Sequence, residues 1–140
     1  MKAKEYLQQI RSLDIKINNR IKQREDLLSR ITSMSLATAD PDRVQTGRNF
    51  DPLGSDMAKY LDMEREINVM IDSLIDLKDK IIGQIHQLPD PAHIDLLYKR
   101  YVEYKTWELI AVEMNYTIRW IHCLHGQALQ EFARVHKTSL

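Results

Sequence analysis

Residues 105–124 read KTWELIAVEMNYTIRWIHCL, and this stretch decides the C-terminal part of the fold. Two short helices joined by a tight turn are predicted, because Thr106 and Thr117 can each cap the N-terminus of a helix. Asn115 between them tolerates the left-handed backbone conformation that a tight turn demands. Two helices that cross over a short turn need a small residue where their backbones meet, and Ala111 supplies it. Together these positions predict a helix-turn-helix.

A third helix is expected just before this pair, over residues 92–101. It follows Leu88-Pro89-Asp90-Pro91, and each proline there pushes the preceding residue out of helical geometry, so a new unit begins near residue 89. The helix after Thr117 continues to Phe132 on a helical spacing of apolar residues. We therefore predict an all-α fold that ends in a three-helix helix-turn-helix domain over residues 89–140.

Two long amphipathic helices are predicted in the first part of the chain, over residues 4–33 and 55–87. Each carries apolar residues separated mostly by threes and fours, Leu28 among those of the first helix. The first helix is basic, the second is acidic, and neither can bury its apolar stripe alone. We expect a long antiparallel coiled-coil hairpin over residues 1–88, and a homodimer through it because two helices bury little surface.

The segment between these helices, residues 34–55, has no helical period. Its helix breakers are Pro41, Gly47, Pro52 and Gly54. A mobile linker is predicted there, in which Phe50 and Leu53 are candidates for local docking. The next helix is expected to begin at Ser55 or Asp56, since either side chain can cap it.

Composition narrows the classes of function. A single cysteine, Cys123, excludes an internal disulfide framework and a cysteine-based zinc site, and no second cluster of ligands accompanies it, so we expect no metal. No catalytic constellation is found, so neither an enzyme nor a cofactor is expected. The chain begins without a signal-peptide core and has no run that could span a bilayer, which predicts a cytoplasmic protein that does not enter membranes.

Trp107 and Trp120 are expected to pack between helices.

Three C-terminal segments share a pattern with a known family: LYKRY at 97–101, KTWELIA at 105–111, and a third that starts at Tyr116-Thr117 and includes Arg119 and Ile121. They resemble region 4 of bacterial RNA polymerase sigma factors, which recognises the promoter −35 element. Small phage and prophage proteins of low-GC Gram-positive bacteria, which carry a similar helical N-terminal half, are a closer resemblance. The sigma likeness covers about the last forty-five residues, and nothing resembles sigma region 2, so promoter melting is not implied.

The resemblance implies a sequence-specific DNA-binding transcriptional regulator, with double-stranded DNA as its partner and RNA polymerase as a further candidate partner. The residues that would face the major groove are Thr117, Ile118, Arg119, His122 and Cys123. Arg119 would read guanine through two hydrogen bonds. Lys105 and Thr106, at a helix N-terminus, would hold a phosphate. Ile118, Cys123 and Gln127 depart from the polar or basic residues that the family usually has at these positions.

Two other functions stay open. A phage DNA-packaging protein of the terminase small-subunit kind also joins a helix-turn-helix to oligomerising helices, and it would form a ring where a regulator would be a monomer or dimer. A protein-binding adaptor is favoured by the charge of residues 88–140, which hold six acidic and six basic side chains. DNA-binding domains are usually basic, so the DNA hypothesis depends on the motif and not on bulk charge.

Overall fold

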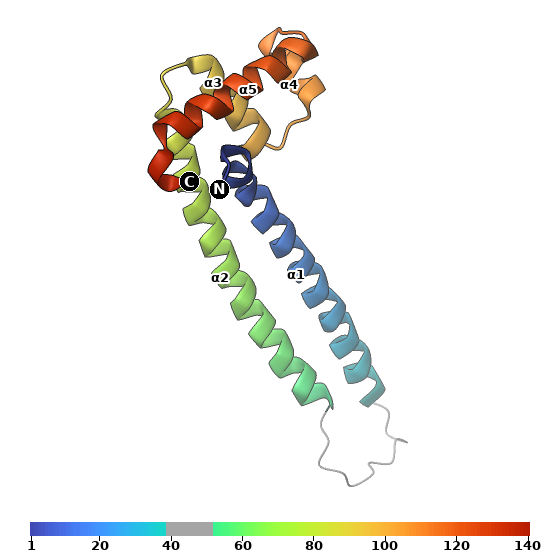
Figure 1. Cartoon of the computed structure of the whole chain (residues 1–140). Helices are drawn as coiled ribbons and strands as arrows, with labels where there is room; N and C mark the ends of the chain where they lie inside the picture. Colours follow the sequence, from blue (N-terminus) through green and yellow to red (C-terminus); the bar gives the residue numbers. More distant parts are fainter. Residues whose placement is uncertain (39–51) are drawn as a thin grey trace. The chain divides into compact units, whose positions relative to one another are not determined.

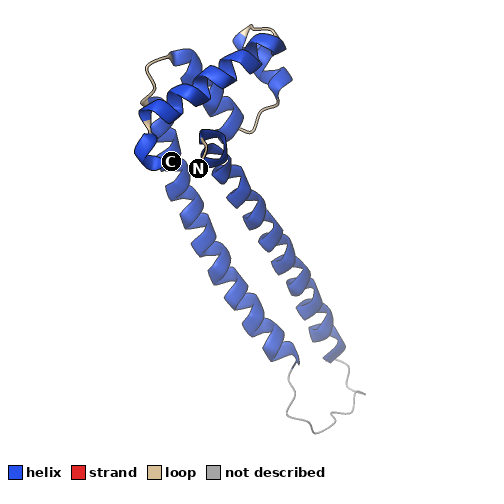
Figure 2. Ribbon diagram, viewed as in Figure 1, coloured by secondary structure: helices blue, strands red, loops and turns tan. Residues whose placement is uncertain are grey.

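The computed structural model describes residues 1–38 and 52–140, and all regular structure within them is helical. Figure 1 shows the elements in order along the chain, and Figure 2 colours the same view by secondary structure. The α-helices are α1 (Ala3–Thr38), α2 (Pro52–His86), α3 (Pro91–Leu97), α4 (Trp107–Met114) and α5 (Ile118–Val135). A π-helical turn (Tyr98–Val102) follows α3 and a 3-10 turn (Lys137–Ser139) follows α5. The all-α prediction is confirmed for the described residues.

The chain divides into two compact units, which are described separately. One unit comprises residues 15–72, and the other comprises residues 1–14 together with 73–140. Both long helices therefore contribute residues to both units. The predicted division into residues 1–88 and 89–140 stays a prediction.

Within residues 15–72, segments of α1 and α2 run antiparallel and share an apolar core. Its members are Leu27, Ile31 and Met63, with Leu53 and Tyr60 packed against them. Arg20 pairs with Glu66 and Arg30 with Asp56, so later residues of α1 meet earlier residues of α2. Exposed ion pairs contribute at most about 1 kcal/mol, and the buried apolar side chains therefore supply most of the stability of this unit.

The ends of the predicted linker are helical, which corrects the prediction. Helix α1 continues to Thr38 and α2 begins at Pro52, while residues 39–51, including Phe50, lie outside the described residues. Proline is well placed in the first turn of a helix, where its missing N–H has no partner to lose. Neither Ser55 nor Asp56 starts the helix. The carboxylate of Asp56 instead accepts hydrogen bonds from Arg30 in α1.

One apolar position of α1 was assigned to the wrong face. Leu27 is 6% exposed and belongs to the core, whereas Leu28, which the predicted stripe includes, is 43% exposed. Adjacent residues of a helix point about 100° apart, so only one of two consecutive leucines can face a partner helix. Leu53 does pack against this core, as the sequence suggested.

The helices of the C-terminal half share a second apolar core. It consists of Leu96, Ile110, Ala111, Ile121 and Leu124, with Ala92, Trp107 and Met114 packed against it. One member comes from α3, two come from α4 and two from α5. Ala111 is 5% exposed in this cluster, so its methyl group fills a space that a longer side chain could not occupy.

The first turns of α1 belong to the same unit as this core and pack on α2 and α5. The hydroxyl of Tyr6 donates to Oε1 of Gln84 at 2.6 Å, and Nε2 of Gln84 donates to Oγ of Ser139 at 2.9 Å. Phe132 is fully buried, with its ring 5.9 Å from that of Tyr6 and 4.7 Å from that of His136. These contacts tie the start of α1 to the end of α5.

Candidate nucleic-acid interface

Helix α4 begins and ends, and α5 begins, as the sequence predicts, whereas α5 continues three residues beyond the predicted Phe132, to Val135. Oγ1 of Thr106 accepts a hydrogen bond from the backbone N–H of Leu109 at 3.3 Å, and Oγ1 of Thr117 accepts one from Trp120 at 3.1 Å. Asn115 ends α4 in the left-handed conformation, with φ 58° and ψ 42°. Such backbone geometry is costly for most residues other than glycine and least so for Asn. Both predicted caps and the predicted turn are confirmed.

Helix α5 buries one face and exposes the residues that were predicted to face a DNA groove. The buried face consists of Ile121, Leu124, Ala128 and Phe132. The exposed candidates are Thr117, Ile118, Arg119, His122 and Cys123. Within residues 1–38 and 52–140, the guanidinium of Arg119 makes no hydrogen bond or ion pair. The first two turns of α5 therefore expose the guanidinium of Arg119, the imidazole of His122, the thiol of Cys123 and the branched aliphatic side chain of Ile118. This exposed side of the helix, together with Thr117, is called the exposed edge of α5 below.

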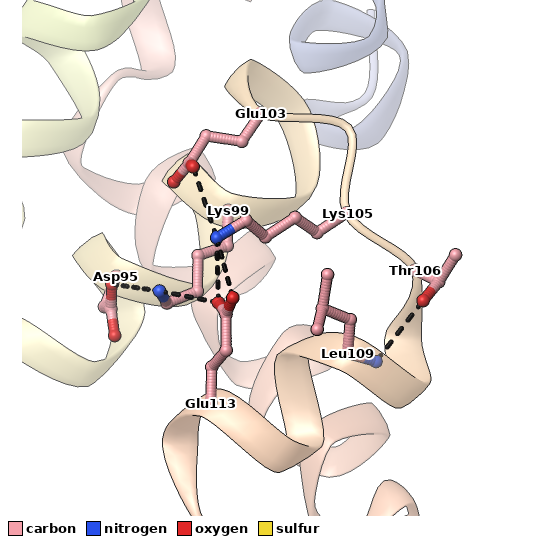
Figure 3. A network of polar contacts seen from close by, with 7 residues as sticks. All are labelled: Asp95, Lys99, Glu103, Lys105, Thr106, Leu109 and Glu113. Carbon is pink, nitrogen blue, oxygen red and sulfur yellow. Dashed lines mark hydrogen bonds and ion pairs between the residues drawn. The ribbon is translucent and has the colours of Figure 1, made fainter.

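Lys105 and Thr106 lie just before α4, and Lys105 is occupied by neighbouring carboxylates. Its Nζ lies 2.9 Å from both carboxylate oxygens of Glu113 and 3.3 Å from Oε2 of Glu103. Nζ of Lys99 also donates to Glu113 at 2.9 Å and lies 3.7 Å from Asp95. Figure 3 shows Glu113 reaching from α4 to both lysines. The predicted phosphate ligand is thus engaged within the protein.

The ion pairs of this network shift the protonation equilibria of its members. Hydrogen bonds from Lys105 and Lys99 hold the pKa of Glu113 below its usual range. The hydrogen bond to Glu113 in turn raises the pKa of Lys99 and of Lys105. All three groups are therefore charged at neutral pH.

A wide turn places the lysines of this network. The backbone N–H of Glu103 bonds the carbonyl of Tyr98 at 3.1 Å, which is the i→i+5 bond of a π-helical turn. The sequence predicted an ordinary helix to residue 101. Tyr104 then adopts φ 58°, and the N–H of Lys105 returns to the carbonyl of Lys99 at 3.0 Å. Such turns interrupt α-helices frequently at functional sites.

Trp107, the first residue of α4, organises a cluster of rings. The guanidinium of Arg100 lies 4.2 Å from the centre of the indole and donates to the carbonyl of Lys105 at 2.9 Å. The rings of His122 and His125 lie 5.0 Å and 4.6 Å from the indole. The prediction that Trp107 packs between helices is confirmed. Arg100 stabilises this cluster and has little freedom to reach a phosphate.

His125, a member of this cluster, also forms a short hydrogen bond with Tyr101. The Tyr101 hydroxyl lies 2.6 Å from Nε2 of His125. Burial raises the pKa of Tyr101 to about 12, so the phenol donates and the imidazole nitrogen accepts. Burial, with the charges of Lys4 and Arg100 nearby, lowers the pKa of His125 to about 4. His125 is therefore neutral at pH 7.

Four exposed apolar side chains, here called the apolar row, come from α4, from the turn after it and from the start of α5. The row consists of Leu109, Val112, Tyr116 and Trp120, all exposed, with Val112 at 73%. The rings of Tyr116 and Trp120 meet edge to face at 6.4 Å. The prediction that Trp120 packs between helices is wrong, because the hydrophobic positions of α5 that face the core are one residue further on, at Ile121, and beyond.

Among the described residues, no helix is long and apolar enough to cross a membrane. The same residues contain no group of three or more His, Cys, Asp or Glu side chains that could hold a metal ion. Neither a protein-family model, nor a curated protein, nor a solved structure matches this chain.

Proposed function

We propose that the chain is a sequence-specific DNA-binding transcriptional regulator of phage or prophage type. In this proposal α4, the turn at Asn115 and α5 form a helix-turn-helix like that of sigma region 4, preceded by an antiparallel helical hairpin. The observation that carries the proposal is the exposed edge of α5, where Arg119 is without a hydrogen-bond or ion-pair partner in the described part of the chain. The opposite face of the same helix is buried.

The exposed edge has the chemistry for reading base pairs in a major groove, which is wide enough to admit an α-helix. The planar guanidinium of Arg119 matches the two acceptors of guanine, which is the commonest specific contact. Ile118 is 45% exposed at the first residue of α5 and offers an apolar contact to a thymine methyl group. The oxygen of Thr117 caps the helix, and its hydroxyl hydrogen remains available to donate.

Phosphate contacts are expected to contribute little to affinity. Lys99 and Lys105 share three carboxylates, and Arg100 stacks on Trp107. Each neutralised phosphate makes the logarithm of the binding constant fall by about 0.9 per decade of salt. With so few available cations, we expect a slope of only about −1 to −3. Sequence preference therefore depends on the edge of α5.

The test is selection of bound duplexes from a random pool by the full chain at about 50 mM salt, where phosphate contacts are strongest. Arg119→Ala should weaken binding to the selected duplex by about 1–3 kcal/mol and relax the preference at one base pair. Arg134→Ala is the matched control, because Arg134 lies on the same helix and pairs with Glu131. If the unaltered chain enriches no sequence, the proposal fails.

A protein-binding function is the second candidate, and the apolar row of Leu109, Val112, Tyr116 and Trp120 favours it. Exposed apolar side chains that gather on one surface mark interaction sites, and here the rings of Tyr116 and Trp120 meet. RNA polymerase is the partner that the sigma resemblance suggests. Purified polymerase should then bind the full chain and lose binding on Val112→Glu, while DNA selection is unchanged. The mass in solution separates the remaining possibilities: a dimer fits the proposed hairpin contact, and a ring fits a DNA-packaging protein.

A further inference from the structure

We propose that Glu113 sets the affinity and the salt dependence of DNA binding by competing with a phosphate for Lys105. This inference rests on the proposed function and adds a residue that acts through another. Glu113 lies on α4, eight positions after Lys105, and both of its carboxylate oxygens lie 2.9 Å from Nζ of that lysine. Figure 3 shows the two side chains meeting between α4 and the connection that precedes it.

The hydrogen-bonding capacity of Lys105 is already used. A lysine ammonium has three donors and no acceptor. In this structure those donors face the two oxygens of Glu113 and, at 3.3 Å, one oxygen of Glu103. A phosphate needs the same donors, so it must displace a carboxylate from Lys105 or share the ammonium with it.

The local charge also opposes a phosphate. The network holds two cations, Lys99 and Lys105, against three carboxylates, Asp95, Glu103 and Glu113. The sum is −1, which repels an incoming anion. Loss of the Glu113 charge alone brings the sum to zero and leaves Glu103, at 3.3 Å, as the one carboxylate beside Lys105 in this network.

Lys99 makes it feasible for Lys105 to leave Glu113 and bind a phosphate. Its Nζ donates to Oε2 of Glu113 at 2.9 Å. When Lys105 turns to a phosphate, Glu113 therefore keeps a cationic partner and is not left as an unpaired charge. The network thus has two arrangements that differ by one ion pair, and the position of Lys105 decides between them.

The test compares Glu113→Gln with the unaltered chain on the duplex selected above and on unrelated duplexes. The amide keeps the shape of the side chain and removes its charge. One additional phosphate contact steepens the salt slope by about 0.9. If the variant and the unaltered chain bind equally at 1 M salt, the variant should then bind roughly 15-fold more tightly at 50 mM salt and roughly fourfold more tightly at 200 mM. The gain should be equal for all duplexes, because phosphates carry no sequence information.

Three further variants separate competition for Lys105 from a general change of charge. Glu108→Gln removes the same charge from the same helix, and among the described residues Glu108 pairs with no lysine, so little gain is expected. Glu103→Gln loosens the longer contact and should give a smaller gain than Glu113→Gln. Combining Glu113→Gln with Lys105→Ala should abolish the gain, because the released lysine is then absent.

The possible outcomes separate this inference from the proposed function. If the unaltered chain selects a duplex but Glu113→Gln shows the same affinity and salt slope, the competition is refuted and the DNA-binding proposal stands. An equal gain in Glu108→Gln would also refute it, since bulk charge would then explain the effect. If neither the unaltered chain nor any variant binds a duplex at 50 mM salt, both proposals fall. Thermal unfolding of each variant shows whether a change in stability accompanies the change in slope.

Discussion

Ala111→Glu tests whether the cluster around α4 holds the candidate interface together. Ala111 is 5% exposed among Leu96, Ile121 and Leu124, so an introduced carboxylate has no partner and no water. Burial raises the pKa of such a carboxyl above its unfolded value of about 4.3. If the group stays neutral in the folded state, each pH unit above 4.3 lowers the free energy of unfolding by about 1.4 kcal/mol. At pH 7 the loss is about 3.7 kcal/mol. Overpacking adds about 1–3 kcal/mol.

The assay is chemical unfolding of Ala111→Glu and of Val112→Glu at pH 7 and near pH 4.5. Val112 is the neighbouring residue and is 73% exposed, so the same charge there should cost less than about 1 kcal/mol. The folded state of Ala111→Glu binds more protons than the unfolded state, so its stability falls as pH rises through this window. Most of the charge-dependent part of its loss should disappear at pH 4.5, while the overpacking cost of about 1–3 kcal/mol remains. Equal losses in both variants, or a loss independent of pH, would show that Ala111 does not lie in a dry apolar cluster.

Three further predictions follow from burial and protonation. Phe132→Ala should lower the free energy of unfolding by about 3–5 kcal/mol, measured by denaturant titration, because its ring is fully buried. Leu27→Ala should cost about 2–5 kcal/mol and Leu28→Ala less than about 1 kcal/mol; equal losses would contradict the assigned face of α1. His125 accepts a hydrogen bond from Tyr101 and has a pKa lowered to about 4, so its folded state binds fewer protons than the unfolded state. Stability should therefore fall as pH drops from about 6.5 to about 4, and His125→Gln should make that decline shallower.

The parts of the fold that sequence predicted well depend on chemistry within four residues. Thr106, Thr117 and Asn115 act on backbone groups that are their near neighbours in sequence, so their residue types predict the caps and the turn directly. Ala111 is predicted to lie where the two helices cross, and it is buried there. Local rules predict these features because no distant part of the chain has to be known.

The features that sequence did not predict depend on contacts between segments. Glu113 and Lys105 lie eight residues apart, on either side of a helix start, and a helical spacing rule covers only neighbours three or four apart. The π-helical turn at Tyr98–Val102 has no breaker residue that would announce it. The contact of Tyr6 with Gln84 joins residues 78 positions apart, and the first helix was assigned to the hairpin alone. Their opposite charges make Lys105 and Glu113 one possible ion pair. Charge alone does not select this pair from the other combinations of a cationic and an acidic side chain in the sequence.

The end of α1 is a further feature that the sequence did not predict. The sequence between Met34 and Thr38 contains no helix breaker, and Pro41 is the first residue that would stop a helix. The predicted linker began seven residues before that proline because the apolar period ended there. Helix α1 nevertheless continues to Thr38, since a helix that is already formed adds residues at little cost.

The single cysteine of the chain lies on the exposed edge of α5. A thiol-reactive dye therefore labels one position, Cys123, in the second turn of that helix, without any engineered residue. Alkylation of this thiol reports directly on what covers the edge. A duplex seated against α5 should slow the modification, whereas a protein that contacts only Leu109 and Val112 of α4 should leave its rate unchanged. The unaltered chain thus carries its own chemical footprint for telling the two proposed modes of binding apart.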